Sequence, residues 1–213
     1  MSNNLLEVTK EIKIDHDNVR DLFDRFKAAT DLKEKAILAN TLVREMAIHG
    51  DAECVRVPAH SDEFGTDGPI HREVSVYNDY SALGLGDTAA HNKEEHAEIK
   101  RLVEAADKTS VEKPEYTDVI ERAVTTFLTH AKEEEDDQHP LIRAKLSPED
   151  NDKLARAFLK ARKMVPRRPH PAAPQTGGLA QKAAGLQAHV HDKVVETVTG
   201  RDFAPLRFSH PDI

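Results

Sequence analysis

Cysteine is nearly absent from this chain, and its scarcity excludes several kinds of site. The 213 residues include one cysteine, Cys54, so no disulfide can form within the chain and no CxxC zinc motif is present. No His-Glu-x-x-His sequence occurs either, which argues against a zinc protease of that class. We expect Cys54 to be a small buried residue rather than a ligand. A reducing, cytoplasmic compartment fits best.

Long apolar runs and an excess of positive charge are also missing. No segment approaches the roughly 18 to 20 apolar residues that a membrane-spanning helix needs, and the first residues lack the basic and apolar regions of a signal peptide. The formal net charge is −8, so nonspecific attraction to nucleic acid or to an anionic membrane is not expected. A short basic run at 162–168 lies beside prolines and is interpreted as a solvated helix end. We therefore expect neither nucleic acid nor a membrane as a partner.

Apolar residues at helical spacing are what the sequence does contain. Hydrophobic residues make up 38% of the chain, enough for the buried core of one domain. The segments in which they recur every three or four positions are 5–29, 31–57, 88–107 and 114–138. Pro58 and Pro140 follow the second and fourth of these segments and are expected to end them. No alternation of period two persists, so the pattern predicts an all-α fold.

The rest of the chain divides into a long connection and a C-terminal extension. The connection at 59–86 contains several glycines and is expected to be a lid or binding segment with a short helix at 70–82. Ser147 and Pro148 form a strong helix start. The expected parts are a four-helix bundle at 1–146, an additional helix packing on it at 147–165, and a Pro-rich linker and tail at 166–213, helical around 179–199.

One motif occurs twice on the apolar stripes of the predicted helices. His49 precedes Glu53 by four residues, and His130 precedes Glu134 by four residues. Four residues advance an α-helix by about 400°, so each imidazole and its carboxylate point toward one target. A further histidine precedes each motif at nearly the same interval: His16 stands 33 residues before the first motif, and His96 stands 34 residues before the second. The duplicated pattern predicts two helical hairpins that close around a shared metal centre.

The chemistry of these six residues favours metal ions. A single histidine on an apolar helical face is usually an ordinary core residue. Four such histidines with two carboxylates one turn further along are different, because each buried carboxylate costs several kcal/mol unless its charge is neutralised. Imidazole with bridging carboxylate in a four-helix bundle points first to a pair of iron ions, with manganese or zinc pairs as less favoured alternatives.

The same residues resemble a known family. The segments 14–20, 49–53, 94–100 and 130–134 are similar to the four helices of the hemerythrin-like HHE cation-binding family, and the resemblance covers roughly residues 8 to 143. It implies an up-down-up-down four-helix bundle with a non-haem di-iron site. By this resemblance the terminal ligands are His16, His49, His96 and His130, and the bridging carboxylates are Glu53 and Glu134.

The chain departs from the oxygen carriers of that family at two positions. Where the carriers have a second histidine one turn before the third-helix ligand, this chain has Asn92, a poor iron ligand. His91 is a substitute only if the helix is distorted, because it lies about 140° from His96 on an ideal helix. In the carriers the fourth-helix acid lies one residue later, at Glu135 here, whereas ideal helical geometry favours Glu134.

These departures decide which functions we expect. A missing histidine leaves an open or water-filled position on one ion, which argues against reversible dioxygen carriage. We expect a di-iron protein that handles dioxygen, peroxide or nitric oxide, or that senses iron or oxygen, with a possible protein partner at the C-terminal tail. The alternative is a regulatory or iron-storage module without turnover. The remaining histidines expected at the surface are His60, His71, His139, His170, His189, His191 and His210.

Overall fold

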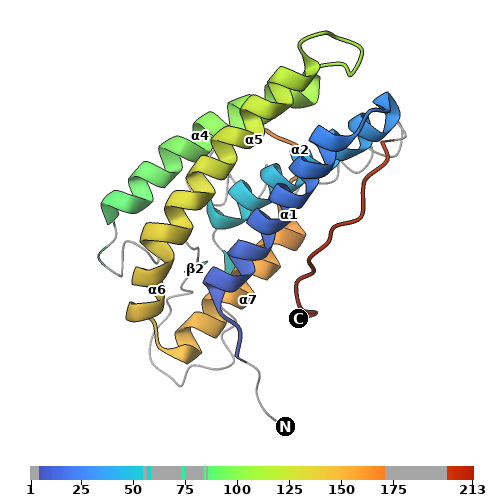
Figure 1. Cartoon of the computed structure of the whole chain (residues 1–213). Helices are drawn as coiled ribbons and strands as arrows, with labels where there is room; N and C mark the ends of the chain where they lie inside the picture. The colour runs from blue at the N-terminus through green and yellow to red at the C-terminus, as the bar shows by residue number, and fades with distance from the viewer. Residues whose placement is uncertain (1–4, 55–56, 59–72, 75–83, 85, 171–200) are drawn as a thin grey trace.

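Four long helices form an antiparallel bundle in the computed structural model, which describes residues 5–54, 57–58, 73–74, 84, 86–170 and 201–213. The helices are α1 (Val8–Ala28), α2 (Leu32–Cys54), α4 (Gly86–Lys108) and α5 (Tyr116–Glu133). Each packs against the next along the chain, and α5 returns to pack against α1 (Figure 1). The predicted all-α, up-down-up-down bundle is confirmed.

Capping side chains mark where two helices begin. The carboxylate of Asp31 accepts a hydrogen bond from the backbone N–H of Glu34 at 2.8 Å and so begins α2. Ser147 likewise accepts from the backbone N–H of Asp150 at 3.1 Å, with Pro148 in the first turn of α7 (Pro148–Met164). Helix α7 packs against α1 and α2, where it covers the end of the bundle that holds the first turns of α1.

The end of the fourth helical segment differs from the prediction. Pro140 does not stop it: α5 passes into a π-helical turn, η2 (Glu134–Gln138), which leads into a short helix, α6 (His139–Lys145). In this turn the backbone N–H of His139 bonds to the carbonyl of Glu134, five residues back. Pro140 then stands in the first turn of α6, where a missing N–H costs no intrahelical hydrogen bond. The helical path continues past the proline for that reason.

Only parts of the long connection and of the extension belong to the described residues. Strands β1 (Val57–Pro58) and β2 (Glu73–Val74) pair antiparallel over two residues each, so the helix predicted at 70–82 is wrong for Glu73 and Val74. The other residues of that predicted helix, and the helix predicted at 179–199, lie outside the described residues. Within the described part of the chain, no helix is both long and apolar enough to cross a membrane.

Two apolar clusters fill the bundle and leave a polar layer between them. One cluster lies among α1, α2, α4 and α5, and its largest members include Phe26, Leu42 and Phe127. The other joins α7 to α1 and α2 around Ile12 and Phe158. The buried polar side chains of the bundle's middle layer lie between the two clusters, so the apolar packing on both sides fixes their position.

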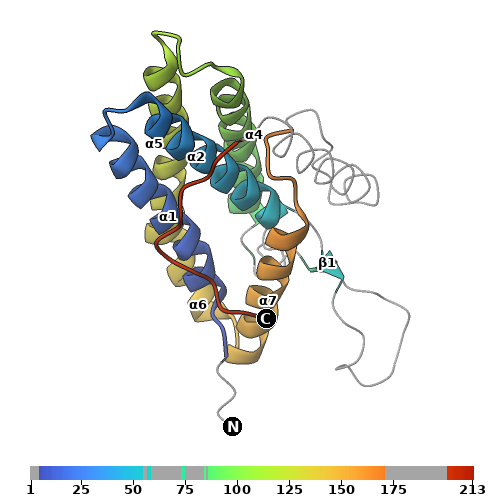
Figure 2. The same cartoon turned by 90° about the vertical axis from the view of Figure 1, so that its right-hand side faces the viewer.

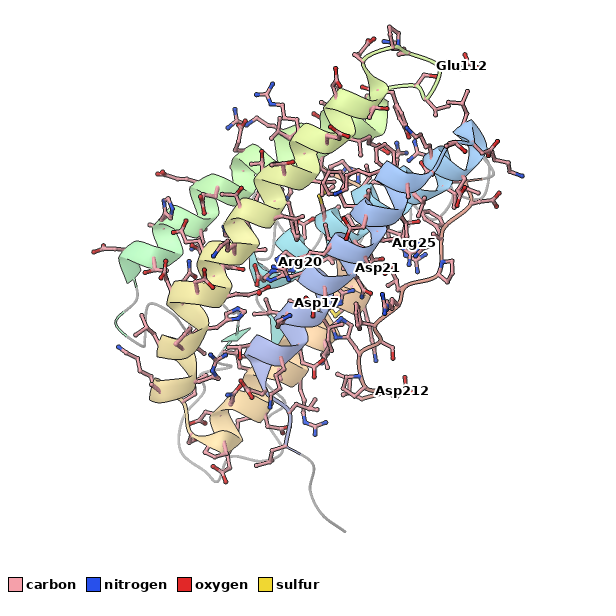
Figure 3. The ribbon with its side chains drawn as sticks, viewed as in Figure 1. Asp17, Arg20, Asp21, Arg25, Glu112 and Asp212 are labelled. Atoms are coloured by element: carbon pink, nitrogen blue, oxygen red, sulfur yellow. The ribbon has the colours of Figure 1, made fainter. Side chains whose placement is uncertain are left out.

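The C-terminal segment 201–213 runs back along α1 and α2 (Figure 2). The amide of Asn18 exchanges two hydrogen bonds with the backbone of Phe208, at 3.0 and 2.9 Å. Arg25 donates to the backbone carbonyl of Pro205 at 2.9 Å. Figure 3 shows Asp17, Arg20, Asp21 and Arg25 following one another along α1, and Asp17 pairs with Arg20 at 2.8 Å. The segment is thus held to α1 by side chains of that helix.

Candidate metal centre

The six residues singled out by the repeated motif meet in the polar layer of the bundle. Their side chains come from all four long helices and the first residue of η2, and none is more than 4% exposed. Their ligand atoms form two overlapping groups, each with all atoms within 4.8 Å of one another. The first group is Glu53, His96, His130 and Glu134, and the second is His16, His49 and Glu134. Glu134 belongs to both groups.

Glu53 and Glu134 each face one histidine of the His16 and His49 pair and one histidine of the His96 and His130 pair. These two pairs form the two halves of the cluster. Oε2 of Glu53 lies 3.4 Å from Nε2 of His49 and 3.5 Å from Nε2 of His96. Glu134 directs Oε2 to Nε2 of His16 at 3.5 Å and Oε1 to Nε2 of His130 at 3.4 Å. A carboxylate with this arrangement can bridge two cations held side by side.

The rings of His96 and His130 approach each other through their Nε2 atoms, which lie 2.7 Å apart. Burial disfavours the charged form of both rings, but at His130 the carboxylates of Glu134, Glu53 and Glu95 together outweigh burial and raise the pKa to about 10. Burial and the charge on His130 hold the pKa of His96 well below its usual range. His130 therefore carries the proton between the two nitrogens. A cation that replaced this proton would find two imidazole nitrogens already directed to it.

Carboxylates fix the outer nitrogen of three of the four histidines. Nδ1 of His49 lies 3.3 Å from Asp15, Nδ1 of His16 lies 2.8 Å from Glu135, and Nδ1 of His130 lies 2.7 Å from Glu95. Because an ionised carboxylate only accepts hydrogen bonds, each Nδ1 is the donor, and Nε2 is the nitrogen that faces the centre. Carboxylates in this role typically orient metal-binding histidines and increase their basicity.

The fourth histidine has a thiol in the corresponding place. Sγ of Cys54 lies 3.8 Å from Nδ1 of His96. Cys54 is 6% exposed, so the prediction that it is a buried residue is confirmed. Burial, with the nearby carboxylate of Asp51, raises the pKa of this thiol to about 12. Cys54 therefore stays a neutral partner of His96.

The structure separates the alternatives that the sequence left open near Asn92. The side chain of His91 is 52% exposed and pairs with Glu95 and Glu133 at the surface, so it points away from the cluster. Asn92 is buried and donates from its amide nitrogen to Glu134 at 3.1 Å. Its amide also exchanges two hydrogen bonds with Gln138, at 2.8 and 2.9 Å. Since the amide oxygen is engaged by Gln138, Asn92 acts as a hydrogen-bond donor to the centre.

The fourth-helix acid that enters the cluster is Glu134. Its carboxylate is completely buried, but the combined attraction of His130, His16 and His49 outweighs the effect of burial and holds the pKa of Glu134 well below its usual range. Glu135 instead bonds to the outer nitrogen of His16 and to Arg20, each at 2.8 Å, and these two partners lower its pKa to about 2 against the effect of burial. The position expected from ideal helical geometry is therefore the one that faces the other five residues.

Two histidines expected at the surface lie elsewhere. His139 is 2% exposed, and its ring is parallel to that of His16 with the ring centroids 6.2 Å apart. His210 is partly buried and bonds to Glu11 and Asp15, each at 2.9 Å. The prediction that His210 lies at the surface is wrong because the C-terminal segment returns to the bundle. No local pattern in 201–213 indicates this return.

A group of charged residues joins the cluster to α7 through Asp15. Arg162 of α7 forms an ion pair with Asp15 and bonds to Glu45 at 3.2 Å. Although burial raises the pKa of Asp15, the combined attraction of Arg162, His210 and His49 holds it well below its usual range. Asp15 therefore remains ionised beside His49. Sequence reasoning missed this group because its members come from α1, α2, α7 and the C-terminal segment.

A small pocket opens beside the cluster at His96. Its volume of about 10 Å³ is lined by Met46, Gly50, Phe127 and Lys100 among others, which leaves room for roughly one water-sized molecule. Gly50 contributes to this space because a side-chain carbon there would lie 3.7 Å from Nδ1 of His96.

Sequence comparison points to the same class of protein. The chain is similar to a hemerythrin-like protein of Schizosaccharomyces pombe, 23% identical over 195 residues that cover 91% of this chain and 87% of that protein. It is also 24% identical over 163 residues to a DNA nickase of Nostoc; this match covers 76% of this chain and 41% of the nickase. No family model and no solved structure matches the chain. The first relative and the buried cluster together support a hemerythrin-like module able to bind metal.

Proposed function

We propose that this protein is a non-haem di-iron protein of the hemerythrin-like kind that handles a small ligand such as dioxygen, peroxide or nitric oxide. The observation that carries the proposal is the convergence of four imidazole Nε2 atoms on two buried carboxylates. Three of those imidazoles are fixed from outside by a carboxylate. This outer arrangement is typical of metal-binding histidines.

The residues present fit a pair of iron ions. His16 and His49 would hold one ion, His96 and His130 the other, and Glu53 and Glu134 would bridge them. The buried carboxylates need a compensating positive charge, because uncompensated charge in the core is strongly unfavourable. Imidazole nitrogen with carboxylate oxygen suits iron, whereas the absence of a thiolate ligand disfavours the softer metals. Manganese and zinc remain less favoured alternatives.

Iron held in this way would supply one-electron redox chemistry and an exchangeable position for a small ligand. The protein's own residues would decide where that ligand approaches. Asn92 donates to Glu134 at 3.1 Å and so holds one bridging carboxylate in orientation. The small pocket lined by His96 borders one half of the centre. Apolar neighbours such as Phe127 exclude bulk water there.

The proposal is tested by adding small ligands to iron-loaded protein. Protein reconstituted with Fe(II) without oxygen, and then oxidised, should show visible absorption bands that shift on addition of azide, because azide would enter the exchangeable position. Nitric oxide added to the reduced protein should likewise change its spectrum. Iron-loaded protein whose spectrum responds to neither ligand would contradict a role in handling small ligands.

A second candidate function is a metal-responsive regulatory module without turnover. It is favoured by the position of Asp15, which lies between His49 at 3.3 Å and His210 of the C-terminal segment at 2.9 Å. Metal bound by His49 would be coupled to this segment, which could then signal metal occupancy to a protein partner. Amide hydrogen exchange in residues 201–213 should slow on metal addition under this function. Exchange independent of metal would contradict it. A cytoplasmic location stays a prediction for both functions.

A further inference from the structure

The two halves of the candidate metal centre each contain two histidines, His16 and His49 in one and His96 and His130 in the other. With Glu53 and Glu134 bridging both ions, as the proposed function requires, each ion has two imidazole nitrogens and two shared carboxylates. A further buried imidazole beside either half would therefore make the two ions unequal.

His139 lies next to the half that contains His16 and His49. Its side chain is 2% exposed and its ring lies parallel to that of His16, with an angle of 4° between the ring planes and 6.2 Å between centroids. Within the described part of the chain, Nε2 of His139 is buried without any hydrogen-bond partner. Nε2 atoms of His16 and His49 are buried without such a partner too. Buried nitrogens without partners are rare in folded proteins and call for an explanation.

The π-helical turn explains how His139 comes to this position. On an undistorted α-helix, a residue five positions after Glu134 would lie about 140° around the helix from it. The i to i−5 hydrogen bond from the N–H of His139 to the carbonyl of Glu134 widens the turn and brings residue 139 back toward the face that carries Glu134. Such π-turns are frequent at functional sites. His130, Glu134 and His139 then follow one another along the same side of the helical segment.

The structure assigns His139 as a further nitrogen ligand of the metal ion held by His16 and His49. This assignment rests on the proposed function and adds a position outside the repeated His and His-x-x-x-Glu pattern. His139 therefore does not replace the histidine that the third helix lacks, because that histidine would belong to the half that contains His96 and His130. Burial also lowers the pKa of His139 to about 4, which leaves its nitrogen neutral and able to bind a cation.

A consequence concerns which ion keeps the exchangeable position. Asn92 occupies the place expected for the missing histidine, and its amide is held by Gln138 and Glu134. With His139 added to the His16 and His49 half, the ion of the His96 and His130 half is the one left with an open position. That half also borders the small pocket at His96. The small ligand is therefore expected on the His96 side.

The test compares metal binding in His139→Gln and His139→Leu with the wild-type protein and with His91→Gln as a control, since His91 is exposed and points away from the centre. Metal-free protein would be titrated with Co(II) and, without oxygen, with Fe(II). Both His139 variants should bind one of two ions at least about 10-fold more weakly, in line with losses known for disrupted metal sites. The visible Co(II) bands should change in intensity, while His91→Gln should match wild type.

A second readout separates coordination from a structural role. Without metal, His139→Leu should melt at or above the wild-type temperature, because it removes a buried nitrogen that lacks a partner. With metal, it should gain less stability than wild type does. If both variants bound metal with the wild-type affinity and showed wild-type Co(II) spectra, the assignment would be overturned. If His139→Gln alone bound metal with the wild-type affinity, the assignment would be overturned too, because a hydrogen-bonding amide would then suffice. Wild-type protein that binds no metal would instead refute the proposed function itself.

Discussion

Nδ1 of His49 lies 3.3 Å from Oδ2 of Asp15, and both side chains are completely buried. The hydrogen bond directs Nε2 of His49 toward the carboxylates of the centre, since Asp15 can only accept. Asp15 stays ionised because Arg162 forms an ion pair with it. One buried carboxylate thus orients a candidate ligand from α2 and joins it to α7.

Replacement of Asp15 by asparagine should weaken metal binding. Asp15→Asn keeps the shape of the side chain but removes the charge that holds His49, so the affinity for the ion in that half should fall by about 10- to 100-fold. Isothermal titration with Fe(II) or Co(II) measures the change. Asp17→Asn is the matched control, because Asp17 lies two residues further along α1 and is 30% exposed. Equal affinities in the two variants would show that Asp15 does not orient His49.

Metal binding should be more sensitive to replacement of Glu53 and Glu134, which face both halves of the centre, than to replacement of neighbouring acids. Glu53→Gln and Glu134→Gln should each disrupt the pair of ions, because a neutral amide bridges cations poorly. Glu133→Gln should have little effect, since Glu133 is 40% exposed. Glu135→Gln should have an intermediate effect through its bond to His16. Metal stoichiometry after gel filtration would reveal the order, and a greater loss in Glu135→Gln than in Glu134→Gln would contradict it.

Asn92 offers a test of the exchangeable position. Asn92→His introduces the nitrogen donor that the third helix lacks, so it should weaken azide binding and slow autoxidation of the reduced protein. The new side chain must also break the paired amides of Asn92 and Gln138, and the lost hydrogen bonds should cost about 1–3 kcal/mol of metal-free stability. Stopped-flow spectroscopy would follow both rates. Autoxidation at the wild-type rate in a variant that still binds two ions would rule out an open position next to residue 92.

The docked C-terminal segment should respond to pH through His210. Burial disfavours the charged form of His210, but its bonds to Asp15 and Glu11 outweigh burial and the repulsion of Arg162, so its pKa is raised. A group whose pKa is raised on folding stabilises the folded state below its unfolded pKa, about 6.5, and loses that effect as pH rises through the folded value. The stability difference between wild type and His210→Ala should therefore be largest near about pH 5 to 6 and shrink at higher pH.

Urea unfolding of metal-free protein at several pH values measures this difference. Asp15 stays ionised across the range because its own pKa is far lower, so the trend belongs to His210. His170→Ala serves as a comparison for loss of a histidine outside the C-terminal segment. A stability difference that grows with pH would contradict the ion pairs described for His210.

Much of the fold and of the candidate site could be predicted because both depend on local periodicity. The i to i+4 spacing of His49 and Glu53, and of His130 and Glu134, places each pair on one helical face in an ordinary α-helix. Apolar residues at the same spacing predicted the helices that carry them. These inferences need no knowledge of how distant segments pack.

The features that escaped prediction depend on distortions and on distant contacts. His139 lies beside His16 after a π-turn that lengthens the path between Glu134 and α6, and the acidic sequence of that turn resembles any solvated helix end. His210 reaches Asp15 only because Asn18 binds the backbone of Phe208, 190 residues away along the chain. Neither relationship has a signature within a short window of sequence.

The central claim is that the buried cluster of four histidines and two glutamates binds a pair of iron ions. Elemental analysis, combined with a visible absorption spectrum, of protein purified from an iron-replete host tests it most directly, with His49→Ala and His130→Ala purified in parallel. We expect two irons per chain and oxo-bridge charge-transfer bands in the wild type, and lower iron content together with a lower melting temperature in both variants. Wild-type protein without bound iron, or variants that keep two irons per chain, would contradict the claim.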